Sequence, residues 1–120
     1  MSLKQKFITI RDNYVINQVK KAEFPDFPED KVRRYRIIFI GRVQHVGFRL
    51  EVCELAKRLE LTGFCRNLEN GDVLVELQGP KNKIIYLVRF MSSLKRIKIE
   101  ERMVGQLKVI KEENGFVKKD

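Results

Sequence analysis

The sequence predicts an α+β fold in which an antiparallel sheet carries two helices on one of its faces. Three observations lead to this prediction. Short stretches rich in β-branched residues alternate with longer amphipathic stretches along residues 34–118. The pair Asn70-Gly71 lies between two of the short stretches, and Asn-Gly is the strongest short signal of a β-hairpin. Gly79-Pro80 then separates the second of these from the next amphipathic stretch.

The first half of this region is predicted to run strand, loop, helix, strand. Tyr35–Ile40 is rich in β-branched and aromatic residues and predicts a strand. Gly41–Gly47 is a loop bounded by glycines. Phe48–Leu61 predicts an amphipathic helix because its apolar residues recur at helical spacing. Thr62–Asn67 predicts a second, short strand.

The second half repeats the pattern after the hairpin. Asp72–Gln78 alternates apolar and polar residues and predicts a strand, and Lys81–Leu94 predicts a helix. Ile97–Val104 and Gln106–Ile110 are strand-like, and Phe116-Val117 leaves open a short last strand. The predicted order is β-α-β-β-α-β with room for a fifth strand, which is the split βαβ or ferredoxin-like sandwich.

Residues 1–33 differ from the rest of the chain. Apolar residues at positions 3, 7, 10 and 14 have roughly helical spacing, whereas Phe24–Asp30 holds two prolines among acidic residues and predicts an extended linker. We therefore predict an N-terminal extension at 1–33 and a domain at 34–120. The extension has three open roles: it packs on the domain, forms a homo-oligomer or stays loose.

Composition narrows the classes of function. The 120 residues contain no apolar run of the roughly 20 that a membrane helix needs and no signal-peptide pattern, so we expect a cytoplasmic protein without a membrane partner. Cys53 and Cys65 form no CxxC motif, which predicts two reduced thiols and no zinc site. The formal charge of +9 favours anionic partners, but charge alone does not separate nucleic acid from small phosphates.

The loop before the first predicted helix of the domain is a candidate anion site. None of the usual helix-capping residues, Ser, Thr, Asp or Asn, occurs between Gly41 and Leu50. The free N–H groups of the first turn and the helix dipole therefore favour a bound phosphate. Arg49 would lean back over this loop and offer its guanidinium to the phosphate. The competing interpretation is an ordinary turn followed by a solvated arginine.

Two stretches resemble the signatures of the acylphosphatase family. GRVQHVGFR, residues 41–49, resembles the pattern G-x-V-Q-G-V-x-F-R. GFCRNLENGDVLVELQG, residues 63–79, resembles the second signature of the family at the expected separation. The resemblance covers about residues 34–118 and leaves residues 1–33 outside it.

The resemblance implies hydrolysis of a small acyl phosphate to a carboxylate and inorganic phosphate, without metal, cofactor or covalent intermediate. It implies that Arg49 binds the phosphoryl group and that Asn67 positions the attacking water. It also implies that the phosphate oxygens are held by the loop residues Gln44, His45, Val46, Gly47 and Phe48 together with Arg49.

His45 departs from the family pattern, which has glycine at this position. A glycine there is free to take a positive φ, and histidine does so less readily. Three interpretations remain: His45 is tolerated with modest strain, it weakens activity by altering the loop, or its imidazole transfers protons or binds anions.

The alternative function is a non-catalytic basic module of the same fold that binds an anion or RNA. RNA readers of this topology stack bases on exposed strand aromatics. Tyr35 and Phe39 share one face of the first predicted strand, the strand at Asp72–Gln78 has no aromatic residue, and the RNP1 pattern is absent. The sequence therefore disfavours nucleic acid as the main partner.

Overall fold

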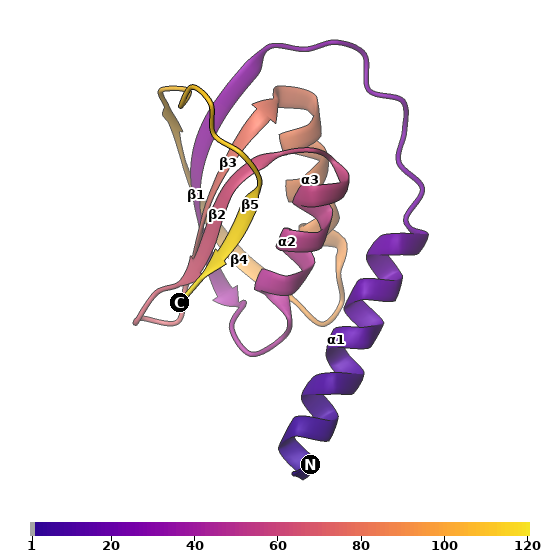
Figure 1. Cartoon of the computed structure of the whole chain (residues 1–120). Helices are drawn as coiled ribbons and strands as arrows, with labels where there is room; N and C mark the ends of the chain where they lie inside the picture. The colour runs from indigo at the N-terminus through magenta and orange to yellow at the C-terminus, as the bar shows by residue number, and fades with distance from the viewer. Residues whose placement is uncertain (1) are drawn as a thin grey trace.

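The computed structural model describes residues 2–120 (Figure 1). Its elements are α1 (Leu3–Lys21), β1 (Val32–Arg42), α2 (Phe48–Arg58), β2 (Thr62–Asn67), β3 (Val73–Pro80), α3 (Lys81–Ser93), β4 (Lys98–Leu107) and β5 (Phe116–Lys119). From β1 to β4 this is the predicted order, and the fifth strand is present. The two strand-like pieces expected after residue 97 are one strand, β4, which continues through Gly105.

The five strands form one sheet in the order β4-β1-β3-β2-β5. The four strands of the split βαβ core pair antiparallel, as predicted, but β5 lies parallel to β2, so the sheet is mixed. The reason is the path of residues 108–115. Leu107 and Thr62 lie at the same end of the sheet, and the connection stays at that end, so β5 starts beside the start of β2 and runs with it (Figure 1).

The core lies between the sheet and the pair α2 and α3, which cover one face of it (Figure 1). Alternate residues of the strands point to this face, among them Ile37 and Phe39 of β1 and Val75 of β3, all at most 2% exposed. Phe39 meets Phe48 of α2 with ring centroids 5.0 Å apart. Each large side chain buried in this way stabilises the fold by about 1.5–3 kcal/mol.

α1 packs against α2, outside the two-layer sandwich (Figure 1). The helix expected within residues 1–33 is confirmed, and residues 22–31 that follow it have no regular structure. Val15 and Val19 are buried against the body, and Arg58 of α2 donates hydrogen bonds to the carbonyls of Val19 and Ala22. The N-terminal half of α1 projects beyond the sandwich.

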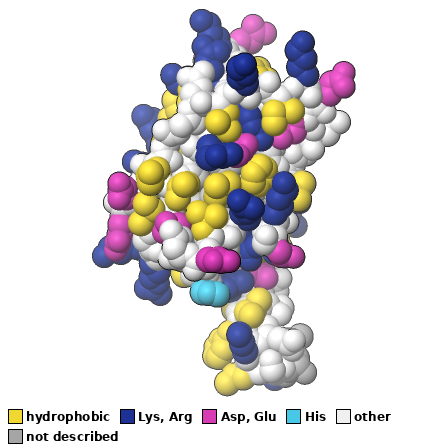
Figure 2. Space-filling view, turned by 90° about the vertical axis from the view of Figure 1, so that its left-hand side faces the viewer, with side chains coloured by type: hydrophobic (Ala, Val, Ile, Leu, Met, Phe, Trp, Pro, Cys, Tyr) yellow, Lys and Arg dark blue, Asp and Glu magenta, His cyan; other side chains and the backbone are white. Residues whose placement is uncertain are grey.

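The opposite face of the sheet carries no helix, and Figure 2 shows a band of apolar side chains there, flanked by Lys and Arg. At one end of this face the connection 108–115 is fastened by Arg34, which is 2% exposed. Arg34 donates to Glu76 at 2.9 Å and to Glu113 of the connection at 2.7 Å. Although burial raises the pKa of Glu76, hydrogen bonds from Arg36 and Arg34 hold it below its ordinary value. Within residues 2–120 no helix is long and apolar enough to cross a membrane.

Candidate active site

The loop between β1 and α2 has the backbone geometry of an anion cradle. His45 has φ 63° and Gly47 has φ 79°, both in the left-handed region. Gly47 is the N-cap residue of α2, and no side chain caps this helix. The N–H groups of the first turn are therefore available to an anion. The positive φ expected at position 45 from the family pattern is present, with histidine in place of glycine.

Gln44 anchors this loop to the β2–β3 turn. Its side-chain Nε2 donates to the carbonyls of Leu68 and Asp72, both at 2.8 Å. The side-chain amide nitrogen is therefore occupied in holding the two loops together. What Gln44 offers an anion is its backbone.

Arg96 supports the loop from behind, and sequence reasoning missed it. Its Nε donates to the carbonyl of Val46 at 2.7 Å and its Nη2 to Glu51 of α2 at 2.7 Å, while Nη1 reaches Gln18 of α1 at 3.3 Å. Burial raises the pKa of Glu51, against the opposing effect of the Arg96 hydrogen bond. Arg96 lies 50 residues from Val46 in the chain, within an ordinary basic stretch, and so gives no sequence signal.

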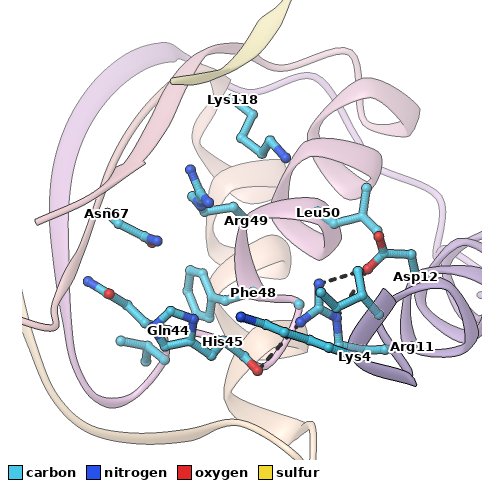
Figure 3. Close-up of a pocket in the computed structure, with 13 residues that line it drawn as sticks. Lys4, Arg11, Asp12, Gln44, His45, Phe48, Arg49, Leu50, Asn67 and Lys118 are labelled. Carbon is cyan, nitrogen blue, oxygen red and sulfur yellow. Dashed lines mark hydrogen bonds and ion pairs between the residues drawn. The ribbon is translucent and has the colours of Figure 1, made fainter. Parts of the chain in front are cut away.

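The structure brings Arg49 and Asn67 together, as the sequence predicted. Arg49 lies in the first turn of α2 and Asn67 is the last residue of β2. Figure 3 shows both side chains directed into one cavity, with Lys118 of β5 on a third side. Arg49 Nη1 donates to the carbonyl of Lys119 at 2.9 Å, so the last strand positions the guanidinium.

This cavity has a volume of about 290 Å³. Its walls come from the loop and the start of α2, from both ends of the described chain and from β2. They comprise Lys4, Ile8, Arg11, Asp12, Val43, Gln44, His45, Gly47, Phe48, Arg49, Leu50, Asn67 and Lys118. Five of the six predicted loop residues are among them, whereas Val46 does not line the cavity and packs against the core. Lysine and arginine outnumber the lone carboxylate, Asp12, so the cavity favours anions.

Cys53 of α2 and Cys65 of β2 lie behind the site as free, buried thiols. The thiol of Cys65 lies 3.9 Å from the carbonyl oxygen of Arg49. A hydrogen bond with Cys53 and burial both raise the pKa of Cys65. The pair fills the contact between the helix that carries Arg49 and the strand that carries Asn67.

The acylphosphatase family model matches residues 35–118. The chain belongs to the acylphosphatase family. It is 36% identical over 85 residues to an acylphosphatase of Vibrio parahaemolyticus, covering 71% of this chain and 94% of the relative. It is 46% identical over 63 residues to an acylphosphatase of Clostridium beijerinckii, covering 52% and 67%. The crystal structure of acylphosphatase from Bacillus subtilis superposes with a TM-score of 0.68 at 28% identity, covering 75% of this chain and 100% of that one.

Proposed function

We propose that this chain hydrolyses acyl phosphates to a carboxylate and inorganic phosphate. The observation that carries the proposal is the uncapped start of α2, which lines one cationic cavity together with Arg49 and Asn67. Membership of the acylphosphatase family supports the same reaction.

The phosphoryl group binds to the backbone N–H groups of the loop from Gln44 to Phe48 and to the guanidinium of Arg49. Phosphoryl transfer depends mainly on positioning and on stabilising charge on the equatorial oxygens, and these donors supply both. The leaving group is a carboxylate of low pKa, so the reaction needs no strong general acid. The proposed mechanism uses neither metal nor cofactor, because the positive charge comes from side chains.

Asn67 orients the attacking water. Its amide offers one acceptor and two donors and does not titrate, so it holds a water in one orientation over a wide pH range. The water attacks phosphorus, the bond between phosphorus and the acyl oxygen breaks, and the carboxylate leaves with that oxygen. No covalent intermediate forms on the protein.

Hydrolysis of benzoyl phosphate in the presence of EDTA tests this proposal. We expect Arg49→Ala to lower kcat by at least 100-fold, as estimated from the loss of an oxyanion donor. Asn67→Ala is expected to lower kcat with little change in KM, because water positioning acts after substrate binding. Arg66→Ala, next to Asn67 on the exposed side of β2, is the matched control and retains activity. No hydrolysis in EDTA, or full activity of Arg49→Ala, would refute the assignment.

The alternative of an RNA-binding module is not favoured. The two aromatic residues of β1 face the helices: Phe39 is fully buried and Tyr35 packs against the core. Neither is available to stack on a base, and β3 has no aromatic residue. Four Lys and Arg side chains instead line a cavity of small-ligand size.

The proposal also includes a cytoplasmic setting and a homo-oligomer formed through α1. The free thiols favour a reducing compartment, since disulfides form readily outside it.

The homo-oligomer is proposed from an apolar stripe on α1 with the alternating four- and three-residue spacing of a helix–helix seam. Its residues, each 58–69% exposed, are Leu3, Phe7, Ile10 and Tyr14. Measuring mass in solution for the native chain and for Phe7→Glu tests this: a dimer that dissociates supports it, and a native monomer overturns it.

A further inference from the structure

One wall of the cavity comes from α1, which lies outside the family match at residues 35–118. Lys4, Ile8 and Arg11 stand three or four residues apart and so share one face of the helix. Figure 3 shows Lys4 and Arg11 directed at the loop, opposite Arg49 and Asn67. This face alternates a cation, an apolar side chain and a second cation along about 10 Å of helix.

Arg11 is held in this position by several contacts. Its Nε and Nη2 donate to Asp12 at 3.1 and 2.9 Å, and its Nη1 reaches the carbonyl of His45 at 3.5 Å. A Cβ at Gly47 would lie 3.3–3.4 Å from Val15 and from the side chain of Arg11. The helix therefore touches the phosphate loop directly, at two of its residues.

A second cavity of about 580 Å³ adjoins the first along α1. Lys4, Ile8, Arg11 and His45 line both, and the second adds the apolar side chains of Leu3 and Phe7. Because His45 of the loop lines both cavities, the acyl part of a substrate that leaves the loop on the α1 side would lie along the second cavity. Ile8, which lines both cavities and lies outside the apolar stripe of α1, offers apolar contact to an acyl body, and Lys4 lies beside it for a charged group.

The charged side chains that line the cavity also favour a substrate with a second anionic group. An unesterified phosphoryl group carries nearly two negative charges at neutral pH. Arg49 and Lys118 match those two charges. Lys4 and Arg11 against Asp12 leave one positive charge in surplus on the α1 side, which a second anionic group on the substrate would match.

We infer that α1 completes the substrate site, and that Lys4 and Arg11 select acyl phosphates whose acyl part carries a second negative charge. This inference rests on the proposed hydrolysis and specifies its substrate. The two cations act on specificity. The transferred phosphoryl group remains with the loop and Arg49.

The test compares benzoyl phosphate with 3- and 4-carboxybenzoyl phosphate, which differ only by a carboxylate on a rigid ring. We measure kcat/KM for each substrate at low ionic strength, for the native chain and for Lys4→Gln and Arg11→Gln. The readout is the ratio of charged to neutral substrate within each protein, because intrinsic reactivity then cancels between variants. The control is Lys6→Gln, which removes the same charge from the same helix outside the cavity lining.

We expect the ratio for at least one carboxylated isomer to fall about threefold in each cavity variant, the effect of one partly exposed ion pair. The ratio stays unchanged in Lys6→Gln, and 0.5 M salt lowers the native ratio, because salt screens exposed charges. Equal ratios in the native chain and both cavity variants would overturn the inference while leaving the hydrolase assignment intact. Failure to hydrolyse all three substrates would instead refute the hydrolase assignment itself.

Discussion

α1 and α2 meet at the same cavity, but they begin in opposite ways. At the start of α1, Ser2 accepts a hydrogen bond from the backbone N–H of Gln5, and the Gln5 side chain accepts one from Ser2, so the capping box is complete. At the start of α2, Gly47 stands in a left-handed conformation and no side chain caps the helix. In α1, side chains of the same segment form hydrogen bonds at the first turn. In α2, no side chain caps the first turn, and its backbone N–H groups are available to an anion.

The start of α2 is the less stable of the two, and it is the one that lines the proposed phosphate site. A missing cap costs about 1 kcal/mol, and a histidine in the left-handed region adds a comparable cost. Two side chains outside α2 stabilise its start. Gln44 donates a hydrogen bond to the turn between β2 and β3, and Arg96 donates hydrogen bonds to Val46 and Glu51. The α1 start needs no such support. The predictions below test this dependence, beginning with the largest effect.

Arg96→Ala should weaken the α2 start most. It leaves the carboxylate of Glu51, which is fully buried, without its cation and frees the carbonyl of Val46. We expect the free energy of unfolding to fall by about 3 kcal/mol, the cost of breaking a buried ion pair. Urea denaturation measures this. The exposed neighbour Lys95→Ala should stay within about 0.5 kcal/mol of the native chain, and an equal loss in both variants would contradict the role of Arg96.

Gly47→Ala and Gly115→Ala form a matched pair, because the two glycines have φ 79° and 74°. Both variants should lose about 1 kcal/mol through the backbone alone. At Gly115 the added Cβ meets nothing within 4 Å, whereas at Gly47 it presses on Val15 and Arg11. Only Gly47→Ala should also lower acyl phosphate hydrolysis, measured with benzoyl phosphate. Equal activity in the two variants would show that the contact between α1 and the loop is unimportant.

Glu51 and Glu76 should give stability profiles of opposite sign with pH. Burial raises the pKa of Glu51 above 4.5, so its stabilising contribution is present below pH 4.5 and is lost as pH rises through the raised pKa. The pKa of Glu76 is lowered, so its contribution is present above pH 4.5 and is lost as pH falls through the lowered pKa. Comparing the unfolding free energy of the native chain with Glu51→Gln and Glu76→Gln from pH 3 to 7 tests both signs. Parallel profiles for the two variants would be incompatible with these shifts.

His45→Gly should have the smallest effect. The change removes the strain of a non-glycine residue in the left-handed region, but it also raises the conformational entropy of the unfolded chain. The two effects oppose each other, so the free energy of unfolding should change by less than about 1 kcal/mol. We expect acyl phosphate hydrolysis to be retained or raised. A loss of more than tenfold in kcat would show that the imidazole itself contributes to catalysis.

The sequence predicted the fold well because the signals in this chain are local. Each of these signals lies within a short stretch of consecutive residues. They are the Asn-Gly hairpin, the apolar faces of α2 and α3, and the uncapped start of α2. Arg49 and Asn67, which line one cavity, could be proposed as site residues for the same reason, since two contiguous motifs contain them. Arg96, Lys118 and Arg11 were missed because each reaches the site from a distant segment. The parallel pairing of β5 was missed because it depends on the path of residues 108–115 around the end of the sheet.

The hydrogen bond from Arg49 to Lys119 joins residues 70 positions apart, and that from Arg96 to Gln18 joins residues 78 apart. Contacts between such distant positions require closing long chain loops and tend to form late in folding. The pocket is therefore complete only when both the last strand and the first helix have docked. In refolding experiments, recovery of activity is expected to lag behind recovery of secondary structure, because the last strand and the first helix must both dock before substrate can be held.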